Sequence, residues 1–309
     1  MLSGPDTYTC PLCRMLLAGA INDSYSGCSA CGSYVYCSSQ SAEEDNRAYF
    51  DAVYRTVSGY VVDARKQRIF SAGLRRDQKN HKEASEAFEG HQTRVRRMLA
   101  GEGRRVLEIG FGEGTVLAEL LSAGTDAWGE ELSVTALENF ATRFPVWAHR
   151  VGKPASAPGK FDFIYCSALF EHLDDPVSFL VTASARLSGE GHIVIDNFPL
   201  VVPGPADTSP EDDICFWKPC HRLLCTTEGL QRMTSASGLR VPALAMHDAY
   251  LYRVLSLHRR HGYLMIERMR NPFLRHADFP GRLRFWMICR QALRVQSRCR
   301  LASAVLAQI

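Results

Sequence analysis

The chain has 309 residues, of which 46% are hydrophobic and 22% charged, and its net charge is +3, a composition typical of an ordinary globular protein. It contains no run of 18 apolar residues, and residues 1–10 lack the basic start and apolar run of a signal peptide, so neither a transmembrane helix nor a secretion signal is expected. We therefore expect a cytoplasmic protein with one large domain and a small one.

Four cysteines near the N-terminus have the paired spacing of a zinc site. Cys10 and Cys13 form one C-x2-C pair, and Cys28 and Cys31 form a second pair after fourteen intervening residues. Four thiolates in two close pairs can bind one structural zinc ion tetrahedrally, and such a closed site shapes a protein rather than catalysing a reaction. Without a secretion signal, cysteines favour reduced thiols and metal ligation over disulfides. We predict a zinc-ribbon-like segment over residues 1–40, the alternative being four ordinary reduced thiols.

Residues 41–100 have a mostly helical pattern. Apolar residues at helical spacing occur around Phe50 and again around Met98. Between them, residues 65–83 are polar and of mixed charge, which favours a solvated face or a connection. We expect a helical leading segment that packs before the first strand of the next domain.

The centre of the chain's organisation is a predicted strand, tight glycine turn and helix. Residues 106–109 are a short, largely apolar run of the kind that fills a buried parallel strand. Gly110, Gly112 and Gly114 follow, and a helical pattern then runs to Gly124. Glycines let the backbone approach a ligand closely, and the free N–H groups at the helix start face that ligand. The spacing is G-x-G-x-G rather than the G-x-G-x-x-G of dinucleotide enzymes, and tight packing is the alternative explanation.

Acidic and imidazole side chains follow the later predicted strands. Glu131 lies 21 residues after Gly110, at the end of the second strand, where a carboxylate can accept hydrogen bonds from both ribose hydroxyls. Glu171 and His172 follow a predicted strand at residues 160–166, at the mouth of the sheet. His172 can remove a proton from a hydroxyl, amine or activated carbon, because its ordinary pKa is near neutral, and Glu171 can orient it or a substrate.

Taken together, these segments resemble class I S-adenosylmethionine-dependent methyltransferases. The matching pieces, in the family's order and at its usual separations, are VLEIGFGEG, GEELS, FDFIYCSALFEHLDDPVSFL, RLSGEGHIVIDNFP and HRLLCTTEGLQRMTSASGLRV. They span roughly residues 88–243. The resemblance implies an α/β fold with a doubly wound, mostly parallel seven-stranded sheet over residues 101–250, and a cofactor across the carboxyl ends of its strands.

The resemblance also implies how S-adenosylmethionine is bound. The glycine turn would hold the methionine portion of the cofactor, and the acid after the second strand would bind its ribose. Many relatives have a further acid after the third strand that binds the adenine amine, but the corresponding residues 146–150 contain none, and residues 153–159 read as a loop. How adenine is recognised is therefore left open. The predicted cofactor-binding residues are Glu108, Gly110, Gly112, Gly114, Glu131 and Cys166.

An insertion near residues 198–222 is expected to cover the acceptor pocket. Its prolines and glycines exclude a regular helix through the first part. Phe216, Trp217, Cys220 and His221 combine aromatic surface with polar tips, as a substrate lid requires. The C-x4-C-H spacing that includes Cys220 and His221 fits a metal site poorly, so we predict a plain lid loop.

Residues 251–309 differ in composition from the rest of the chain. From residue 253 onward they contain twelve arginines, no lysine and only two acids, interleaved with apolar and aromatic residues. Such a mixture can bind RNA, an anionic carrier or an anionic membrane surface, whereas the abundance of apolar residues favours a packed segment. We expect a helical, arginine-rich appendage that docks on the core or on a second subunit of a homodimer.

The sequence thus predicts an enzyme that transfers a methyl group from S-adenosylmethionine to a small-molecule, sugar-nucleotide or carrier-bound acceptor, with His172 and Glu171 as the candidate catalytic residues. Whether His172 acts as a base is left open, because E-H-L often occurs at this place in relatives with different substrates. One alternative is an RNA methyltransferase that grips RNA with the ribbon and the arginine-rich tail. A second is a non-catalytic zinc-ribbon interaction protein on a methyltransferase fold. The intact glycine turn and Glu131 weigh against this last function, and the missing adenine-binding acid weighs for it.

Overall fold

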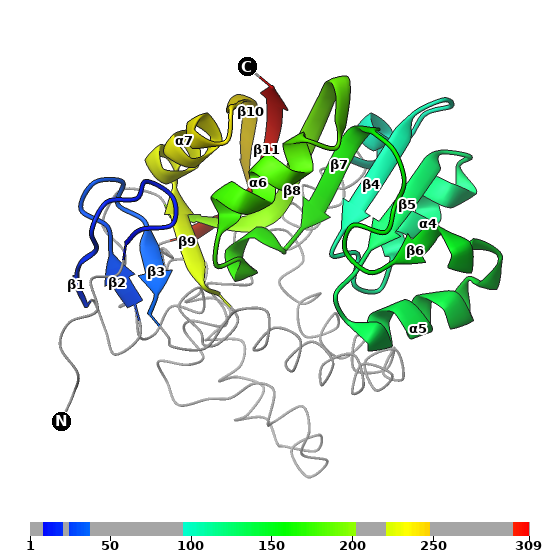
Figure 1. Cartoon of the computed structure of the whole chain (residues 1–309), viewed down its shortest axis with the longest axis horizontal. Coiled ribbons are helices and arrows are strands. Elements are labelled where there is room, and N and C mark those ends of the chain that lie inside the picture. Colours follow the sequence, from blue (N-terminus) through cyan, green and yellow to red (C-terminus); the bar gives the residue numbers. More distant parts are fainter. Residues whose placement is uncertain (1–8, 21–24, 38–94, 202–220, 248–298, 309) are drawn as a thin grey trace, which may run out of the picture.

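The fold is a mostly parallel sheet with helices on both faces and a small ribbon at one end (Figure 1). The computed structural model describes residues 9–20, 25–37, 95–201, 221–247 and 299–308. Within these ranges no helix has the length and apolar character needed to cross a membrane. The parallel strands of the sheet are β4 (Arg105–Ile109), β5 (Asp126–Glu130), β6 (Val151–Gly152), β7 (Phe161–Ser167) and β8 (Leu187–Val201).

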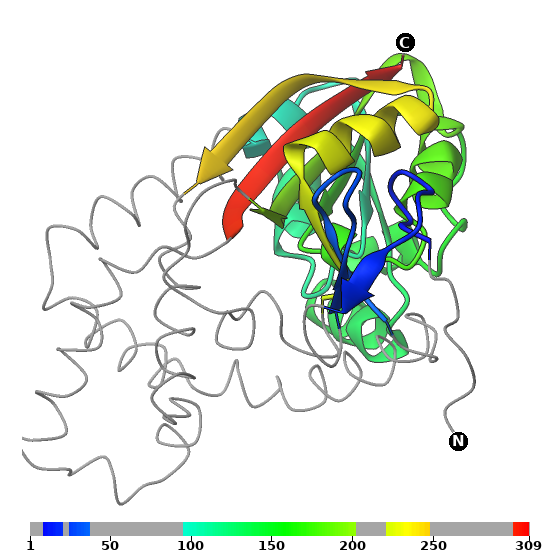
Figure 2. The same cartoon turned by 90° about the vertical axis from the view of Figure 1, so that its left-hand side faces the viewer.

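The strand order places a topological switch point at β4. In the described part of the chain, the core strands lie in the order β6-β5-β4-β7-β8-β11-β10, where β10 is Leu239–His247 and β11 is Cys299–Gln308. β11 is antiparallel to both of its neighbours, and Figure 2 shows it running alongside β10. β5, the next strand in the sequence, pairs with one edge of β4, and β7 pairs with the other edge. Ligands of doubly wound sheets bind at such a point, outside the carboxyl ends of the strands.

In the described part of the chain, helices cover both faces of the sheet. On one face, Leu117 of α4 and Phe140 of α5 pack in a buried cluster with Val106 of β4. On the other face, Leu180 of α6 and Met233 of α7 pack in a second cluster with residues of β7 and β8. These contacts confirm the doubly wound arrangement. The helices are α4 (Thr115–Ser122), α5 (Val134–Arg143), α6 (Pro176–Ser184) and α7 (Thr227–Ala236), and the 3-10 turns are η1 (Pro145–Arg150) and η2 (Phe170–His172).

Three of these helices begin at side chains suited to the N-cap position. Ser133 accepts a hydrogen bond from the Ala136 N–H at 3.2 Å at the start of α5. Asp175 and Thr226 cap α6 and α7 in the same way, at 3.0 Å each. Each cap satisfies a backbone donor that would otherwise lack a partner. The helix starts, and hence the loops at the carboxyl ends of the strands, are therefore fixed by local sequence.

The ribbon extends the sheet beyond the end of β7. Its strands β1 (Ala18–Ala20), β2 (Tyr25–Gly27) and β3 (Tyr34–Tyr36) form an antiparallel set, and β3 pairs with β9 (Leu223–Thr226). β8 pairs with β7 as far as Asp196 and with β9 from Leu200 onward. Since β11 occupies the other edge of β8, β9 and the ribbon lie past the carboxyl end of β7. This placement brings the ribbon to the end of the sheet where the ligands were predicted.

The C-terminal residues correct one prediction. Residues 251–309 were expected to form a helical appendage, but residues 299–308 form strand β11, inserted between β8 and β10. Leu306 of this strand lies opposite Ile193, and both side chains are fully buried in the core. Residues 248–298, including most of the arginines, lie outside the described residues.

Two boundaries inside the core also differ from the prediction. The insertion expected near 198–222 begins later, because residues 198–201 are the last part of β8, and residues 202–220 lie outside the described residues. Residues 146–150, placed after the third strand by sequence, belong to η1 and precede that strand, which is β6. Of the leading segment only residues 95–100 are described, and residues 95–99 are helical as expected.

Candidate functional site

The glycine turn lies at the carboxyl end of β4 and leads into α4. Gly110, Gly112 and Gly114 have φ angles of 69°, 55° and 69°, a left-handed conformation that other residues rarely adopt. A Cβ atom on Gly114 would also clash with the ring of Phe140, so packing and backbone geometry both require glycine there. α4 begins directly after Gly114, and its first N–H groups therefore lie beside the turn.

Glu131 braces the glycine turn from the end of β5. Its Oε2 atom accepts a hydrogen bond from the Gly112 N–H at 2.9 Å. Its Oε1 atom accepts from the N–H groups of Leu132 and Ser133 at 2.8 and 3.0 Å. A carboxylate has about four lone-pair sites, so capacity remains for a ligand hydroxyl. The carboxylate thus links the predicted ribose position to the shape of the turn.

Two predicted cofactor-binding residues are buried. Glu108, on β4, is 4% exposed, and burial raises the pKa of its carboxyl to about 8, against the lowering effect of the Leu117 N–H. Cys166, on β7, is fully buried in the core, and burial raises the pKa of its thiol. Both side chains are therefore shielded from solvent, and their contact with a cofactor stays a prediction.

Strained backbone occurs directly after β7 and at the adjacent point inside β8. Ala168 and Asn197 have φ angles of 48° and 55°, although neither is glycine. The Ala168 N–H donates to the Asp196 carbonyl at 2.9 Å, and the Asn197 amide donates to the Ser167 hydroxyl at 3.0 Å. Asp196 also accepts a hydrogen bond from the Tyr165 hydroxyl at 3.0 Å. Strain of this kind is common where a chain shapes a ligand site.

Glu171, His172 and His221 form a cluster just beyond β7. One potential ligand atom from each of them lies within 4.8 Å of the other two. His172 Nε2 is 3.9 Å from Glu171 Oε1, and the two imidazole rings are 5.4 Å apart between centroids. Glu171 and His172 are 3% and 7% exposed, and burial raises the pKa of the Glu171 carboxyl to about 8. His221, which follows the insertion in the sequence, therefore lies beside the predicted catalytic pair.

The ribbon and η2 hold His221 in this position. The Tyr25 hydroxyl of β2 donates to the His221 carbonyl at 2.5 Å. The Arg222 N–H donates to the Glu171 carbonyl at 2.7 Å, and the Arg222 side chain binds Asp174 at 3.0 Å. The side chain of Leu169, two residues before Glu171, lies against Gly110. The cluster is thus connected on one side to the ribbon and on the other to the glycine turn.

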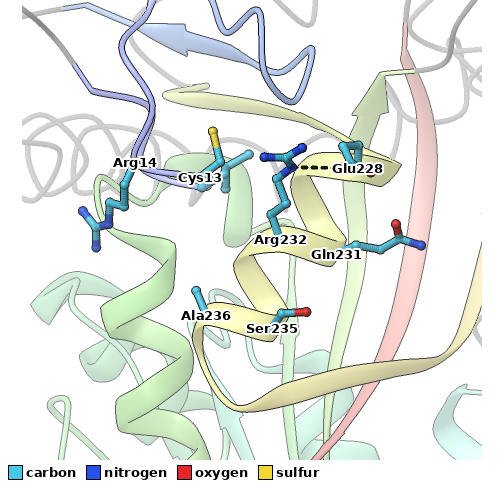
Figure 3. A pocket seen from close by; sticks show the side chains of 8 residues that line it. Cys13, Arg14, Glu228, Gln231, Arg232, Ser235 and Ala236 are labelled. Atoms are coloured by element: carbon cyan, nitrogen blue, oxygen red, sulfur yellow. Dashed lines mark hydrogen bonds and ion pairs between the residues drawn. The ribbon is translucent and has the colours of Figure 1, made fainter.

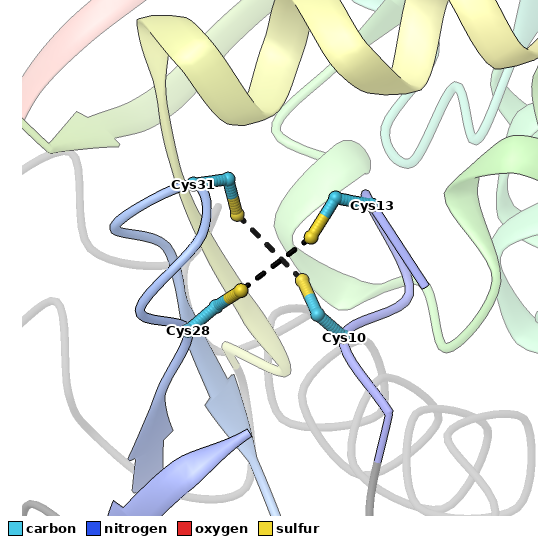
Figure 4. A group of neighbouring side chains, drawn as sticks. All are labelled: Cys10, Cys13, Cys28 and Cys31. Carbon is cyan, nitrogen blue, oxygen red and sulfur yellow. Dashed lines mark hydrogen bonds between the residues drawn. The ribbon is translucent and has the colours of Figure 1, made fainter. Parts of the chain in front are cut away.

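The four N-terminal cysteines converge in two matching turns (Figure 4). The sulfur atoms of Cys10 and Cys31 are 3.7 Å apart, and those of Cys13 and Cys28 are 3.4 Å apart. A tetrahedron with zinc–sulfur bonds of about 2.3 Å has sulfur–sulfur edges of about 3.8 Å. The Cys10 and Cys28 N–H groups donate to the carbonyls of Met15 and Ser33, each five residues on, so the two turns share one geometry. The donor set and its dimensions fit a four-thiolate zinc site.

The loop after β6 contains no acidic residue that could bind adenine. Contacts with Glu130 and Arg186 fix its conformation instead. Glu130 accepts a hydrogen bond from the Ala157 N–H at 2.8 Å and a bidentate ion pair from Arg186 at 2.8 and 2.9 Å. Arg186 also donates to the Ala157 carbonyl at 3.0 Å. Since Glu130 is 2% exposed and fully paired, it is engaged in structure and does not replace the missing acid.

One pocket of about 360 Å³ lies away from this site, between the ribbon and α7 (Figure 3). Cys13 and Arg14 of the ribbon line one side, and the ion-paired Glu228 and Arg232 of α7 line the other. Neither the glycine turn nor the cluster at η2 contributes to it. The pocket marks the seam between the ribbon and the core.

Sequence reasoning missed two contributions to the site. His221 was assigned to a lid, because nothing in its spacing reveals that β9 lies beside η2. Tyr25 was not selected at all, although it is 1% exposed and supports His221. Their role depends on contacts between segments about 200 residues apart, and the only sequence signal is the Cys220-His221-Arg222 run preceding a strand pattern.

Comparison with known families and curated proteins gives sequence matches to the core. A family model described as "Methyltransferase domain" matches residues 81–242, more than half of the chain. A ubiquinone biosynthesis O-methyltransferase from Methylococcus capsulatus is 36% identical over 100 residues, covering 30% of this chain and 42% of the relative. A protein of the same name from Aromatoleum aromaticum is 34% identical over 97 residues, covering 29% and 41%. The match thus spans about two fifths of the length of these relatives.

Solved structures are more distant. An O-methyltransferase from the trans-AT PKS multienzyme of Brevibacillus brevis, in complex with S-adenosyl-L-homocysteine, is 12% identical with a TM-score of 0.49. That alignment covers 76% of this chain and 77% of the other. The family assignment accordingly depends on the sequence match over residues 81–242.

Proposed function

Since this chain belongs to the methyltransferase-domain family, we propose that it transfers a methyl group from S-adenosylmethionine to a hydroxyl of a small-molecule, sugar-nucleotide or carrier-bound acceptor. The observation that best supports donor binding is the link between Glu131 and the glycine turn at the switch point of the sheet. The name of the curated relatives, O-methyltransferase, favours oxygen as the methylated atom.

In this proposal, the methyl donor lies across the carboxyl ends of β4 and β5. The glycine turn and the start of α4 hold the methionine portion, and Glu131 accepts hydrogen bonds from the ribose hydroxyls. Glu108 supports the turn from within the core, where it accepts from the Leu117 N–H. The donor's sulfonium supplies an activated methyl group, so the protein's main task is alignment.

The acceptor is proposed to lie between the donor and the Glu171–His172 pair. Its oxygen forms a bond to the methyl carbon while the methyl–sulfur bond breaks, and that electron pair stays on the sulfur. The hydroxyl proton passes to His172 or to solvent. Glu171, 3.9 Å from the imidazole, favours the protonated form of His172 when its own carboxyl is ionised.

The ribbon is proposed to hold one structural zinc ion through Cys10, Cys13, Cys28 and Cys31. The four sulfurs have the chemistry and the separations that zinc requires. A closed four-thiolate site has no open position, so its role is to keep the ribbon folded against β9. Elemental analysis of purified protein should give about one zinc per chain when no other metal is added.

A direct test combines donor binding with methyl transfer. Calorimetry should detect S-adenosylhomocysteine binding to the full chain, and radiolabelled donor should transfer its methyl group to a phenol, sugar-nucleotide or carrier-bound acceptor in a substrate panel. Glu131→Gln should weaken both, whereas Glu138→Gln, on the exposed side of α5, should leave both unchanged. Absence of donor binding in the wild-type chain would contradict the proposal and favour the non-catalytic alternative.

RNA binding, homodimer formation and a cytoplasmic location stay predictions. The arginine-rich residues that motivated the first two lie mostly in 248–298, outside the described residues. Methylation of bulk cellular RNA in the same assay, with binding that falls steeply as salt rises, would favour the RNA alternative.

A further inference from the structure

The cluster of Glu171, His172 and His221 has the composition of a metal site. It presents two imidazoles and one carboxylate, each with a potential ligand atom within 4.8 Å of the others. The three residues come from two segments joined by the hydrogen bond from the Arg222 N–H to the Glu171 carbonyl. Glu171 and His172 are consecutive in η2, and the tertiary structure brings His221 beside them.

Among the described residues, one oxygen of the Glu171 carboxyl group lacks a hydrogen-bond partner. Glu171 is 3% exposed, and this oxygen, Oε2, is buried. A buried polar atom without a partner is destabilising, so proteins rarely keep one without a function. In the described part of the chain, His172 is the one cationic side chain within ion-pair distance of Glu171. A bound cation would satisfy this oxygen and offset its burial.

We propose that Glu171, His172 and His221 bind one divalent transition-metal cation at the mouth of the site, separate from the four-cysteine site. Two nitrogens and one carboxylate oxygen suit Zn²⁺, Fe²⁺ or Co²⁺ rather than Mg²⁺ or Ca²⁺, which prefer oxygen ligands alone. Three ligands from the described residues leave the cation an open position. The open position can be occupied by water or by an oxygen of another molecule.

The location of the cluster gives the cation a role that depends on the proposed function. The Leu169 side chain, two residues before Glu171, lies against Gly110, so the cation would be near the position proposed for the transferred methyl group. An acceptor hydroxyl bound there would lose its proton to solvent more readily, because a cation lowers the pKa of a bound oxygen. The inferred acceptor class is therefore one with an ionisable oxygen that can bind a metal, such as a phenol or catechol. His172 then binds the cation instead of acting as the base.

Titration with Co²⁺ can distinguish this site from the four-cysteine site of the ribbon. The full-length protein, purified with its cysteine site filled by zinc, is titrated with Co²⁺ by calorimetry and by visible absorption. We expect about one further equivalent to bind, with the weak absorption bands of nitrogen and oxygen ligation and without the intense thiolate-to-cobalt band. His221→Ala should weaken this binding by at least about tenfold, as expected for loss of a ligand. The matched control is His192→Ala, since His192 lies on β8 and its ring stacks on Phe163.

Each outcome is decisive. If wild-type protein binds no further Co²⁺, or if the thiolate band shows that cobalt has entered the cysteine site instead, the proposal is overturned. Equal loss in His221→Ala and His192→Ala would also contradict it. Glu171→Gln guards against a folding artefact, since it keeps the shape of the side chain and should weaken Co²⁺ binding while S-adenosylhomocysteine still binds. Donor binding without cobalt binding would leave the proposed function intact and return His172 to the role of base.

Discussion

The Tyr25 hydroxyl donates a 2.5 Å hydrogen bond to the backbone carbonyl of His221, and so joins the cysteine ribbon directly to the cluster at the mouth of the site. Tyr25 is 1% exposed and packs edge-on against Tyr36, so its hydroxyl has a fixed direction. The ribbon is therefore more than an appendage at the N-terminus. It supports one wall of the region where the acceptor is proposed to bind.

Tyr25→Phe should impair acceptor-dependent steps without affecting donor binding. Loss of one hydrogen bond to a carbonyl should cost about 0.5–1.5 kcal/mol, which corresponds to about a two- to tenfold loss in kcat/KM for the acceptor. Binding of S-adenosylhomocysteine should not change, because the glycine turn is untouched. Tyr34→Phe, on the neighbouring strand β3, is the control. Equal effects on acceptor and donor would argue that Tyr25 serves general stability instead.

Cys28→Ser should release the zinc proposed for the ribbon and loosen the wall that contains His221. Metal binding to such a site is coupled to folding, so the ribbon should lose protection in hydrogen exchange while β4, β5 and β7 keep theirs. Cys37→Ser, outside the four-cysteine cluster, should retain the metal. A ribbon that stays fully protected after metal removal would show that zinc does not stabilise it.

Glu131→Gln should weaken S-adenosylhomocysteine binding by roughly 1.5–3 kcal/mol, the range for hydrogen bonds to a charged group. The amide of glutamine also keeps only one acceptor oxygen, so it cannot hold Gly112, Leu132 and Ser133 as the carboxylate does. Titration calorimetry against the Glu138→Gln control measures the effect. Unchanged affinity would remove Glu131 from the cofactor site.

Glu108 should make stability fall as pH rises. Its pKa in the folded protein is raised from 4.5 to about 8 by burial, so the unfolded chain releases its proton first. The stabilising contribution is complete below about pH 4.5 and is lost progressively toward pH 8, with a slope of at most about 1.4 kcal/mol per pH unit. Urea unfolding should show that the free energy of unfolding of Glu108→Gln rises relative to that of the wild type across this pH window. A constant difference between the two proteins would contradict the raised pKa.

Removal of residues 299–308 should unfold the core rather than trim an accessory tail. β11 lies between β8 and β10, so its removal would expose an edge on each of them. It would also take away the fully buried side chains of Ala304 and Leu306 and leave their neighbours in the core uncovered. Thermal unfolding and light scattering should report lower stability and aggregation. A stable, donor-binding chain without these residues would contradict the strand assignment.

The sequence by itself determined the elements whose signal is local. The apolar run of β4 and the glycine turn predicted a strand and helix because backbone geometry at Gly110, Gly112 and Gly114 admits few other residues. The paired cysteines predicted their cluster because each C-x2-C pair forms one short turn. Glu131 was predicted at the end of the second strand, and it lies directly after β5. Its carboxylate reaches the glycine turn because parallel strands bring their carboxyl ends to one edge of the sheet.

Only the tertiary structure decided which distant segments meet. Residues 299–308 were predicted as part of a helical tail. Their apolar and arginine composition does not reveal that this segment pairs as a strand between β8 and β10. His221 read as a lid residue, and its place beside Glu171 and His172 follows from the pairing of β9 with the far end of β8. Sequence periodicity reports which face of an element is apolar, whereas the partner of that face depends on the packing of the whole chain.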